Sequence, residues 1–317
     1  MLTHFTSLDA IDASEFSDLL AVALYLKRRR AWGVAEHALT GQTLAMVFEK
    51  PSLRTRLSFE VAMTELGGRS LYIRGEEVGM GVREPVKDVA RVLSRYVQGI
   101  MARVFAHQSI TDLAAYGSVP VINGLSDECH PCQALADMLT IREHFGRLEG
   151  LSVVFVGDAN NVCRSLARAC VLSGARFTVA CPARYAFSAK DIAAFGGAWG
   201  GQVTQVHDPK AAVAGAHVLY TDVWTSMGQE AERERRLRDF QGYQVNEALI
   251  ARARPECRIM HCLPAHRGEE ITDGAVEHPR SVIFDQAENR LHAQKAVLRL
   301  LLCQDAAAVV AAARAEG

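Results

Sequence analysis

The chain has 317 residues, of which 49% are hydrophobic, and this length exceeds what one core usually supports, so two domains of roughly 150 residues each are expected. With 22% charged residues and a formal net charge of −1, the sequence argues against a nucleic-acid or membrane-surface partner, because both usually require a strong basic excess. No apolar run approaches the roughly 18 residues of a membrane span, and eight scattered cysteines are typical of reduced thiols, so we expect a cytoplasmic protein.

Short apolar runs alternate with helical patterns along almost the whole chain. Such alternation is typical of βαβ units, so the sequence predicts an α/β fold of two domains, each a parallel sheet flanked by helices. In the first half, strands are predicted at Leu44–Phe48, Ser70–Ile73, Gly99–Val104 and Val119–Ile122. Helices are predicted there at Ser52–Leu66, Pro85–Tyr96, Ser109–Tyr116 and Pro131–Phe145.

In the second half, strands are predicted at Ser152–Val156, Arg176–Ala180, Val203–His207, His217–Val223, Arg258–Cys262 and Ser281–Phe284, with helices mainly between them. The short polar segment Gly146–Gly150 predicts a domain boundary, which gives a first domain over residues 1–146 and a second over residues 147–289. The run Asn289–Ala313 is rich in Leu, Ala and Val at helical spacing. Residues 290–317 are therefore expected to form a terminal helix that can pack on either domain, including back on the first.

The segment that follows Phe48 predicts an anion site. An apolar strand ends there, Pro51 interrupts it, and a helix begins at Ser52. The first backbone N–H groups of a helix lack an intrahelical acceptor and lie at the positive end of its dipole, so they favour phosphate. Arg54 adds a bidentate donor and Thr55 adds a hydroxyl in the same turn. The plainer interpretation is a capped helix whose arginines are solvated.

Other polar side chains also follow predicted strands, at the carboxyl ends where parallel sheets bind ligands. In the first domain they are Arg103, His130, Pro131, Cys132 and Gln133. In the second domain they are Asn160, Asn161, Asp222, His261 and Cys262. A cationic pocket on one domain and an amide, a carboxylate and a thiol on the other indicate a cleft that joins a phosphorylated substrate to an amine or amino acid.

Several of these residues also have other interpretations. Arg103 can be solvated or ion-paired, His130 can cap a turn, and Asp222 can cap a helix. Cys129 and Cys132 have the spacing of a redox C-x-x-C motif, although it follows several βα units instead of opening a small domain.

A metal or nucleotide site is a further alternative. His130, Cys132, His261 and Cys262 are suitable ligand types, but no second C-x-x-C or closely spaced histidine pair completes a set of four. The segment Val156–Asn161 follows a strand as a dinucleotide-binding turn would, but it lacks the G-x-G-x-x-G glycines. We therefore expect neither a metal nor another cofactor.

Four separated motifs carry a family resemblance. In chain order they are Lys50–Arg56 (KPSLRTR), His130–Gln133 (HPCQ), Asp222–Gly228 (DVWTSMG) and His261–Pro264 (HCLP). The chain resembles ornithine carbamoyltransferases over nearly its whole length. In that family, the four motifs correspond to the two carbamoyl-phosphate elements, the ornithine-recognition loop and the catalytic cysteine loop. Aspartate carbamoyltransferases share the first two elements but lack this loop and the cysteine, so the resemblance favours ornithine over aspartate.

The resemblance implies transfer of a carbamoyl group from carbamoyl phosphate to L-ornithine, giving L-citrulline and phosphate in arginine metabolism, with no metal or covalent intermediate. It also implies a homotrimer. The catalytic residues that it implies are Arg54, Arg103, His130, Asp222 and Cys262. Those implied to bind carbamoyl phosphate are Ser52, Leu53, Arg54, Thr55, Arg103, His130, Pro131, Cys132, Gln133, Cys262, Leu263 and Arg290. Those implied to bind ornithine are Asn161, Asp222, Ser226 and Met227.

Two residues depart from the family pattern. Leu53 stands where threonine is usual, which removes a hydroxyl but leaves a backbone N–H able to meet phosphate. Gly79 stands where many relatives have glutamine, in a loop that in the family reaches the neighbouring subunit's site. Rival functions are another carbamoyltransferase acting on putrescine, acetylornithine or a related amine, and a catalytically silent phosphate binder.

Overall fold

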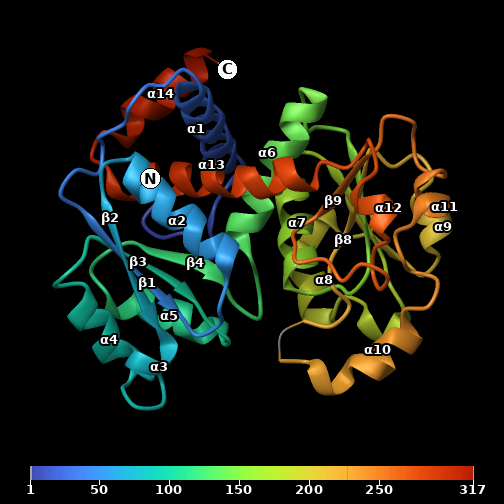
Figure 1. Cartoon of the computed structure of the whole chain (residues 1–317), viewed down its shortest axis with the longest axis horizontal. Helices are drawn as coiled ribbons and strands as arrows, with labels where there is room; N and C mark the ends of the chain where they lie inside the picture. The colour runs from blue at the N-terminus through green and yellow to red at the C-terminus, as the bar shows by residue number, and fades with distance from the viewer. Residues whose placement is uncertain (1, 227, 317) are drawn as a thin grey trace. The chain divides into compact units, whose positions relative to one another are not determined.

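The computed structural model of the chain describes residues 2–226 and 228–316, which form two compact units (Figure 1). Unit 1 comprises the residues up to Leu139 and those from Glu288 onward, and unit 2 comprises Thr140–Ala287. The divisions fall inside helices α6 (Pro131–Phe145) and α13 (Ile283–Leu302), whereas the sequence predicts them after residues 146 and 289. The composition of a continuous helix does not change where one unit passes into the other. The sequence therefore marks only the end of α6, by the glycine at position 146.

Unit 1 contains a parallel four-stranded sheet in the order β2-β1-β3-β4. Its strands are β1 (Thr43–Phe48), β2 (Arg69–Arg74), β3 (Gly99–Arg103) and β4 (Val121–Leu125). The helices between them are α2 (Leu53–Glu65), α3 (Gly75–Val78), α4 (Val86–Leu93) and α5 (His107–Tyr116). The three strands other than β2 are almost wholly buried, while β2 at the sheet edge is partly exposed.

Both faces of β1 are covered. Ala45 and Val47 pack in one hydrophobic cluster with side chains from α4 and α5. Because side chains alternate along a strand, Leu44 and Met46 point to the opposite face, and both are fully buried as well. A strand buried on two faces must be apolar throughout, which explains why its sequence shows a continuous apolar run.

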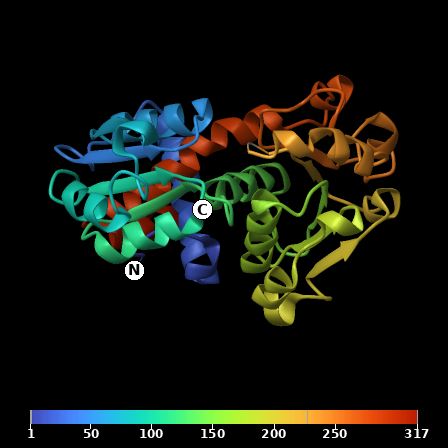
Figure 2. The same cartoon turned by 90° about the horizontal axis from the view of Figure 1, so that it is seen from below.

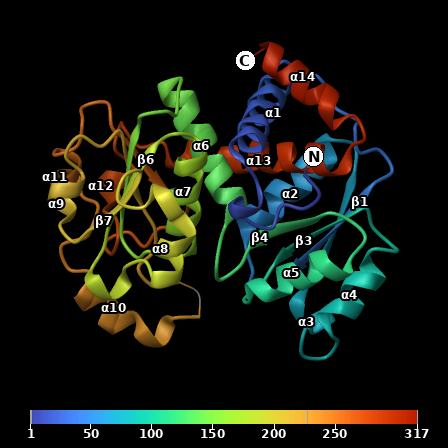
Figure 3. The same ribbon diagram turned by 180° about the vertical axis from the view of Figure 1, so that it is seen from behind.

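Helices α1 (Ala13–Ala31) and α14 (Ala306–Glu316) of unit 1 lie side by side (Figures 1 and 3). Their contact includes an ion pair between Arg314 and Asp18. Helix α1 is absent from the predicted elements, although Asp12 and Glu15 form a capping box that marks its start. The terminal run, predicted as one helix, is divided into α13 and α14.

Unit 2 contains a parallel five-stranded sheet in the order β7-β6-β5-β8-β9 with helices on both faces (Figure 2). Its strands are β5 (Ser152–Val156), β6 (Arg176–Ala180), β7 (Val203–Val206), β8 (Val218–Thr221) and β9 (Arg258–His261). Its helices are α7 (Asn161–Leu172), α8 (Ala189–Phe195), α9 (Pro209–Ala212), α10 (Arg233–Asp239), α11 (Glu247–Ile250) and α12 (Asp273–Val276). Across the described ranges of both units, no helix has the combined length and apolar character needed to cross a membrane.

The predicted strand Ser281–Phe284 is wrong. Ser281 makes a single bridge with Ile259, and α13 begins two residues later at Ile283. A short apolar run cannot be assigned to a strand or a buried helix by periodicity alone, and here it forms the first turn of a long helix.

Each sheet reverses its strand order at one position. In unit 1 the chain passes from β1 to β2 on one side and later to β3 on the other. In unit 2 it passes from β5 to β6 and later to β8. Open parallel sheets bind ligands at the carboxyl ends of the strands beside such a reversal. The candidate residues of each unit should therefore gather beyond β1 and β3, and beyond β5 and β8.

Candidate active site

The first half-site lies at the start of α2 in unit 1. Ser52 is the N-cap of this helix: its Oγ accepts a hydrogen bond from the Thr55 N–H at 3.3 Å and donates one to Thr55 Oγ1 at 3.0 Å. Helix geometry leaves the other first-turn N–H groups without an intrahelical acceptor, at the positive end of the dipole. The side chain of Leu53 is 69% exposed, so it adds no polar group to this turn.

Arg290 connects three helices of unit 1 and is 3% exposed. Its Nη1 donates to Gln133 Oε1 at 2.7 Å, and its Nη2 donates to Thr55 Oγ1 at 3.1 Å. Gln133 is itself fixed, because its Nε2 donates to Asp137 Oδ1 at 2.8 Å. The planar guanidinium thus holds the first turns of α2 and α6 beside α13.

His130, immediately before α6, is surrounded by positive charge and is 5% exposed. Burial lowers the pKa of its imidazole well below the ordinary value of 6.5, and the charges of Arg290, Arg103 and Arg54 lower it further. The imidazole is therefore neutral at physiological pH. The three arginines act on one ring, so the structure brings together the cationic residues that the sequence predicts for phosphate.

A pH series of unfolding measurements tests the state of His130. Below pH about 6.5 the unfolded chain binds a proton at this ring and the folded protein does not, so stability that is present above that pH is lost as the pH falls. From pH about 6.5 downward, wild type is expected to lose up to about 1.4 kcal/mol of unfolding free energy per pH unit more than His130→Asn. Urea titrations measure the difference, and parallel pH slopes for the two proteins would contradict a buried neutral imidazole.

The two cysteines of the C-x-x-C spacing are buried thiols. Cys132 is fully buried, and its Sγ donates to the Asn123 carbonyl at 3.4 Å. Burial raises the pKa of Cys132 to about 12. A redox-active cysteine needs an accessible, stabilised thiolate, so this environment argues against the redox interpretation.

Lys50 is a candidate residue that sequence reasoning did not select by itself. It is 9% exposed, and its Nζ lies 4.3 Å from the centroid of the Phe105 ring. Burial lowers the pKa of Lys50, and the charge of Arg103 lowers it further. The sequence could have indicated Lys50 by its position directly before Pro51 and two residues after β1, where a cation would add to the anion site.

The second half-site lies at the strand-order reversal in unit 2. Asn160 caps α7, and its Nδ2 donates to Asp222 Oδ2 at 2.8 Å. Asp222 directly follows β8 and is 6% exposed. The turns after β5 and β8 are therefore in direct contact, as the sheet order predicts. Asn161 is the first residue of α7, and its Oδ1 accepts the N–H of Val162 at 3.0 Å.

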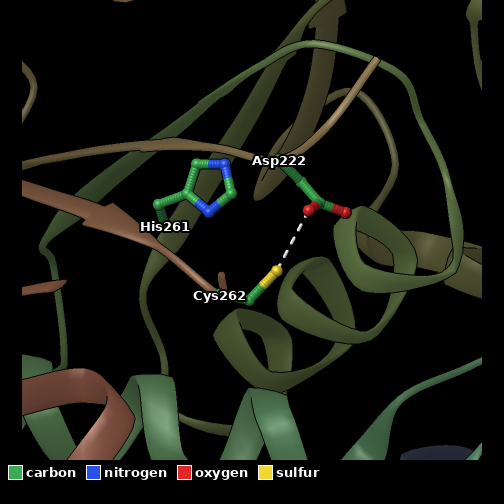
Figure 4. A group of neighbouring side chains, drawn as sticks. All are labelled: Asp222, His261 and Cys262. Atoms are coloured by element: carbon green, nitrogen blue, oxygen red, sulfur yellow. Dashed lines mark hydrogen bonds between the residues drawn. The ribbon is translucent and has the colours of Figure 1, made fainter. Parts of the chain in front are cut away.

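Cys262 lies beside Asp222 (Figure 4). It directly follows β9, and its Sγ donates to Asp222 Oδ1 at 3.0 Å. Its side chain is only partly buried. The carboxylate of Asp222 thus receives one bond from a thiol and one from the amide of Asn160. Both donors are neutral, so the negative charge is left for a cationic ligand group such as an ammonium.

His261 has both ring nitrogens engaged. The Leu263 N–H donates to His261 Nδ1 at 2.8 Å, which assigns the ring proton to Nε2, and Nε2 lies 3.1 Å from Glu270 Oε1. His261 and Glu270 are buried, and Leu263 has a left-handed backbone with φ of 59°. Ligand atoms of Asp222, His261 and Cys262 lie within 4.8 Å of one another. With its lone pair already used, however, His261 is a poor metal ligand.

Glu270 was not selected from the sequence, because nothing in its local pattern connects it with His261. The remaining predicted ornithine residues follow β8. The Ser226 N–H donates to Gln229 Oε1 at 3.2 Å, and Met227 lies outside the described residues.

The departure at Gly79 has a backbone cause. Gly79 ends α3 with φ of 61°, and a Cβ at this position would lie 2.6 Å from the Cβ of Arg83. The loop conformation of this chain therefore requires glycine there.

Comparisons with known proteins give one result for both units. The aspartate/ornithine carbamoyltransferase family matches residues 3–143 with its carbamoyl-P binding domain and residues 149–301 with its Asp/Orn binding domain. The chain is 49% identical over 306 residues to an ornithine carbamoyltransferase of Methanocorpusculum labreanum, covering 96% of this chain and 99% of that protein. It is 55% identical over 291 residues to the ornithine carbamoyltransferase of Thermus thermophilus, covering 91% and 93%. The solved structure of ornithine carbamoyltransferase from Pyrococcus furiosus matches with a TM-score of 0.91 at 50% identity, covering 94% and 96%.

Proposed function

The chain belongs to the aspartate/ornithine carbamoyltransferase family, and on this premise we propose that it transfers the carbamoyl group of carbamoyl phosphate to the side-chain amine of L-ornithine, giving L-citrulline and phosphate. The observation that carries the choice of ornithine is the contact between Cys262 Sγ and Asp222 Oδ1 at 3.0 Å. It joins the loop and the cysteine that distinguish the ornithine members from the aspartate members. The protein is thus a carbamoyltransferase of arginine metabolism.

Unit 1 is assigned to carbamoyl phosphate. The phosphate is assigned to Ser52, Leu53, Arg54, Thr55, Arg103 and Arg290. As the amine attacks, negative charge builds on the carbamoyl oxygen and then on the departing phosphate. Fixed cations and N–H donors therefore stabilise the transition state more than the ground state. His130 and Gln133 are assigned to the carbamoyl group, because a neutral imidazole and an amide can donate there without adding charge. Pro131 and Cys132 form the turn that carries them.

Unit 2 is assigned to ornithine. The carboxylate of Asp222 suits the α-ammonium group, and Asn161, Ser226 and Met227 are assigned to the α-amino and carboxylate groups. The backbone carbonyls of Cys262 and Leu263 are assigned to the carbamoyl NH₂, which they would orient for attack.

The attacking amine must first lose a proton, because its solution pKa resembles that of lysine, near 10.4. Desolvation lowers the pKa of a bound amine. Two groups of unit 2 can accept the proton, the carboxylate of Asp222 and the thiolate form of Cys262. In the structure the thiol of Cys262 donates to Asp222, so in this protonation state only the carboxylate of Asp222 can accept the proton.

A citrulline assay with four amine acceptors tests the function. With carbamoyl phosphate present, L-ornithine should give a ureido product, whereas putrescine, acetylornithine and aspartate should give little. Preference for putrescine or acetylornithine would identify a different carbamoyltransferase. No product with any acceptor would identify a silent binder of carbamoyl phosphate.

Substitution of Cys129 separates this function from thiol redox chemistry. A dithiol mechanism needs both cysteines of the motif, so Cys129→Ser should abolish it. The carbamoyl transfer proposed here uses neither thiol, so the variant should form citrulline with nearly wild-type kcat and KM. A steady-state citrulline assay of purified Cys129→Ser measures both constants. Loss of citrulline formation in a variant with an unchanged circular dichroism spectrum would contradict a mechanism that uses neither thiol.

We further propose a cytoplasmic homotrimer that binds neither nucleic acid nor membrane. The eight cysteines are thiols in the structure, which supports a reducing compartment. Leu53, Leu57 and Val61 repeat every four residues along α2 and are exposed, so they form an apolar stripe suited to contact with another copy. Analytical ultracentrifugation tests the trimer.

A further inference from the structure

The turn between β9 and α12 brings a histidine and two glutamates together. His266, Glu269 and Glu270 each offer one ligand atom, and these atoms lie within 4.8 Å of one another. His266 Nδ1 is 3.8 Å from Glu269 Oε2. His266 is exposed, Glu269 is partly buried and Glu270 is fully buried, so the group extends from the surface into unit 2. The carbamoyl transfer proposed above assigns none of the three to a substrate.

Two carboxylate oxygens of this group are buried and unsatisfied. Glu269 Oε2 and Glu270 Oε2 have no hydrogen-bond partner among the described residues. Glu270 is 0% exposed, and its other oxygen accepts the His266 N–H at 2.6 Å and lies 3.1 Å from His261 Nε2. A carboxylate oxygen that has lost water without gaining a donor is costly. A bound ion or water is the usual explanation of such an oxygen in a native structure.

The charges around the turn favour a cation at these oxygens. Arg233 forms an ion pair with Oε1 of Glu269, which leaves Oε2 of the same carboxylate available. The ring of His261 that meets Glu270 is neutral, because its Nδ1 accepts an N–H and only Nε2 carries a proton. Arg267, in the same turn, pairs with two carboxylates of the α12 region instead. Two carboxylates are thus paired with one guanidinium and one neutral imidazole, and a net negative charge is left.

Main-chain contacts hold the turn in shape. The Glu269 N–H donates to the His266 carbonyl at 2.9 Å, and the Gly268 N–H donates to the Ile271 carbonyl at 2.8 Å. Gln244 Nε2 donates to the carbonyls of Gly268 and Glu269, both at 2.9 Å. A turn that is already ordered costs little to bind, so an ion needs to recruit only the exposed side chain of His266.

We propose that His266, Glu269 and Glu270 form a binding site for one divalent cation of the Zn²⁺ type. Zn²⁺ is bound by imidazole nitrogens and carboxylate oxygens, and sites with three protein ligands keep a fourth position open. Mg²⁺ and Ca²⁺ prefer oxygen ligands alone and need more of them. The exposed His266 gives the ion a path from solvent. The ion takes no part in carbamoyl transfer, and it would join the surface turn to the buried carboxylate of Glu270.

A cobalt titration tests this site. Co²⁺ substitutes for Zn²⁺ and reports its ligands, because nitrogen and oxygen ligands give weak visible absorption whereas thiolates add strong charge-transfer absorption in the near ultraviolet. In chelator-treated wild type, the first equivalent of Co²⁺ should give visible bands without thiolate absorption. His266→Gln and Glu269→Gln each remove one ligand and should weaken binding about tenfold or more. Glu234→Gln removes an exposed carboxylate of α10 and should bind Co²⁺ like wild type.

Urea unfolding gives a second measurement of the same site. An ion that binds only the folded protein stabilises it, so the urea midpoint of wild type should rise with the Co²⁺ concentration. The midpoint of His266→Gln should be nearly independent of Co²⁺. His266 is exposed, so this substitution leaves the core unchanged.

Three results would overturn the proposal. Thiolate absorption that persists in His266→Gln would place the ion at a cysteine such as Cys262. Equal affinity of wild type, His266→Gln and Glu269→Gln would exclude these side chains as ligands. Absence of Co²⁺ binding to wild type would mean that water alone satisfies the two glutamate oxygens. None of these measurements depends on citrulline formation, so they test the ion site separately from the proposed function.

Discussion

Arg54→Ala is expected to lower kcat about a hundredfold or more, which is the scale of losing one preorganised donor at a developing charge. Arg54 lies in the first turn of α2, and its charge reaches His130 together with those of Arg103 and Arg290. The variant leaves the other two arginines in place, so carbamoyl phosphate should still bind. The measurement is steady-state citrulline formation at saturating ornithine.

Arg56→Ala is the matched control for this prediction. Arg56 lies on the same helix, but it pairs with Glu60 at 2.9 Å and covers the ring of Tyr72 at 4.2 Å. Its loss should therefore change kcat little. Near-normal turnover of Arg54→Ala, or the same loss in both variants, would reject the role given to Arg54.

Asp222→Asn is expected to raise the KM for ornithine about a hundredfold, equivalent to ~2.7 kcal/mol, because a partly desolvated charge pair with the substrate ammonium is lost. The asparagine keeps the shape of the side chain and can still accept the bond from Asn160 Nδ2. The KM for carbamoyl phosphate should change little. Initial rates with each substrate varied in turn give both constants.

Asp208→Asn controls for the loss of a carboxylate elsewhere in unit 2. Asp208 is exposed and caps α9, a position where asparagine serves as well as aspartate. Both KM values should be unchanged in this variant. If Asp222→Asn instead weakened the two substrates to the same extent, the assignment of ornithine to unit 2 would be lost.

Much of the fold was predictable because the information is local. Continuous apolar runs gave the positions of the buried strands β1, β3 and β5, and the order of Pro51 and Ser52 located the start of α2 within one residue. The candidate residues at strand ends followed from the general geometry of parallel sheets. The same local patterns could not separate the first turn of α13 from a strand.

The contacts that organise the two half-sites depend on distant residues. Thr55 and Arg290 are 235 residues apart in the sequence, and Asp158 and Arg236 are 78 apart. No spacing or periodicity encodes such pairs, so Arg290 was assigned only by family resemblance, while Arg236 and Glu270 were not identified. Only the structure identifies the side chains that contact the predicted residues and hold them in place.

Unit 1 consists of two segments that are separated in the sequence by unit 2, and this has a consequence for biosynthesis. Unit 2 is one uninterrupted stretch, Thr140–Ala287, whereas unit 1 also needs the residues from Glu288 onward. All residues of unit 2 are therefore translated before α13 and α14 are complete. Until then α1 lacks the helix that packs on it, and Thr55 lacks the guanidinium of Arg290. The nascent N-terminal part of unit 1 therefore lacks Arg290 until unit 2 has been translated, and its anion site is completed only after that point.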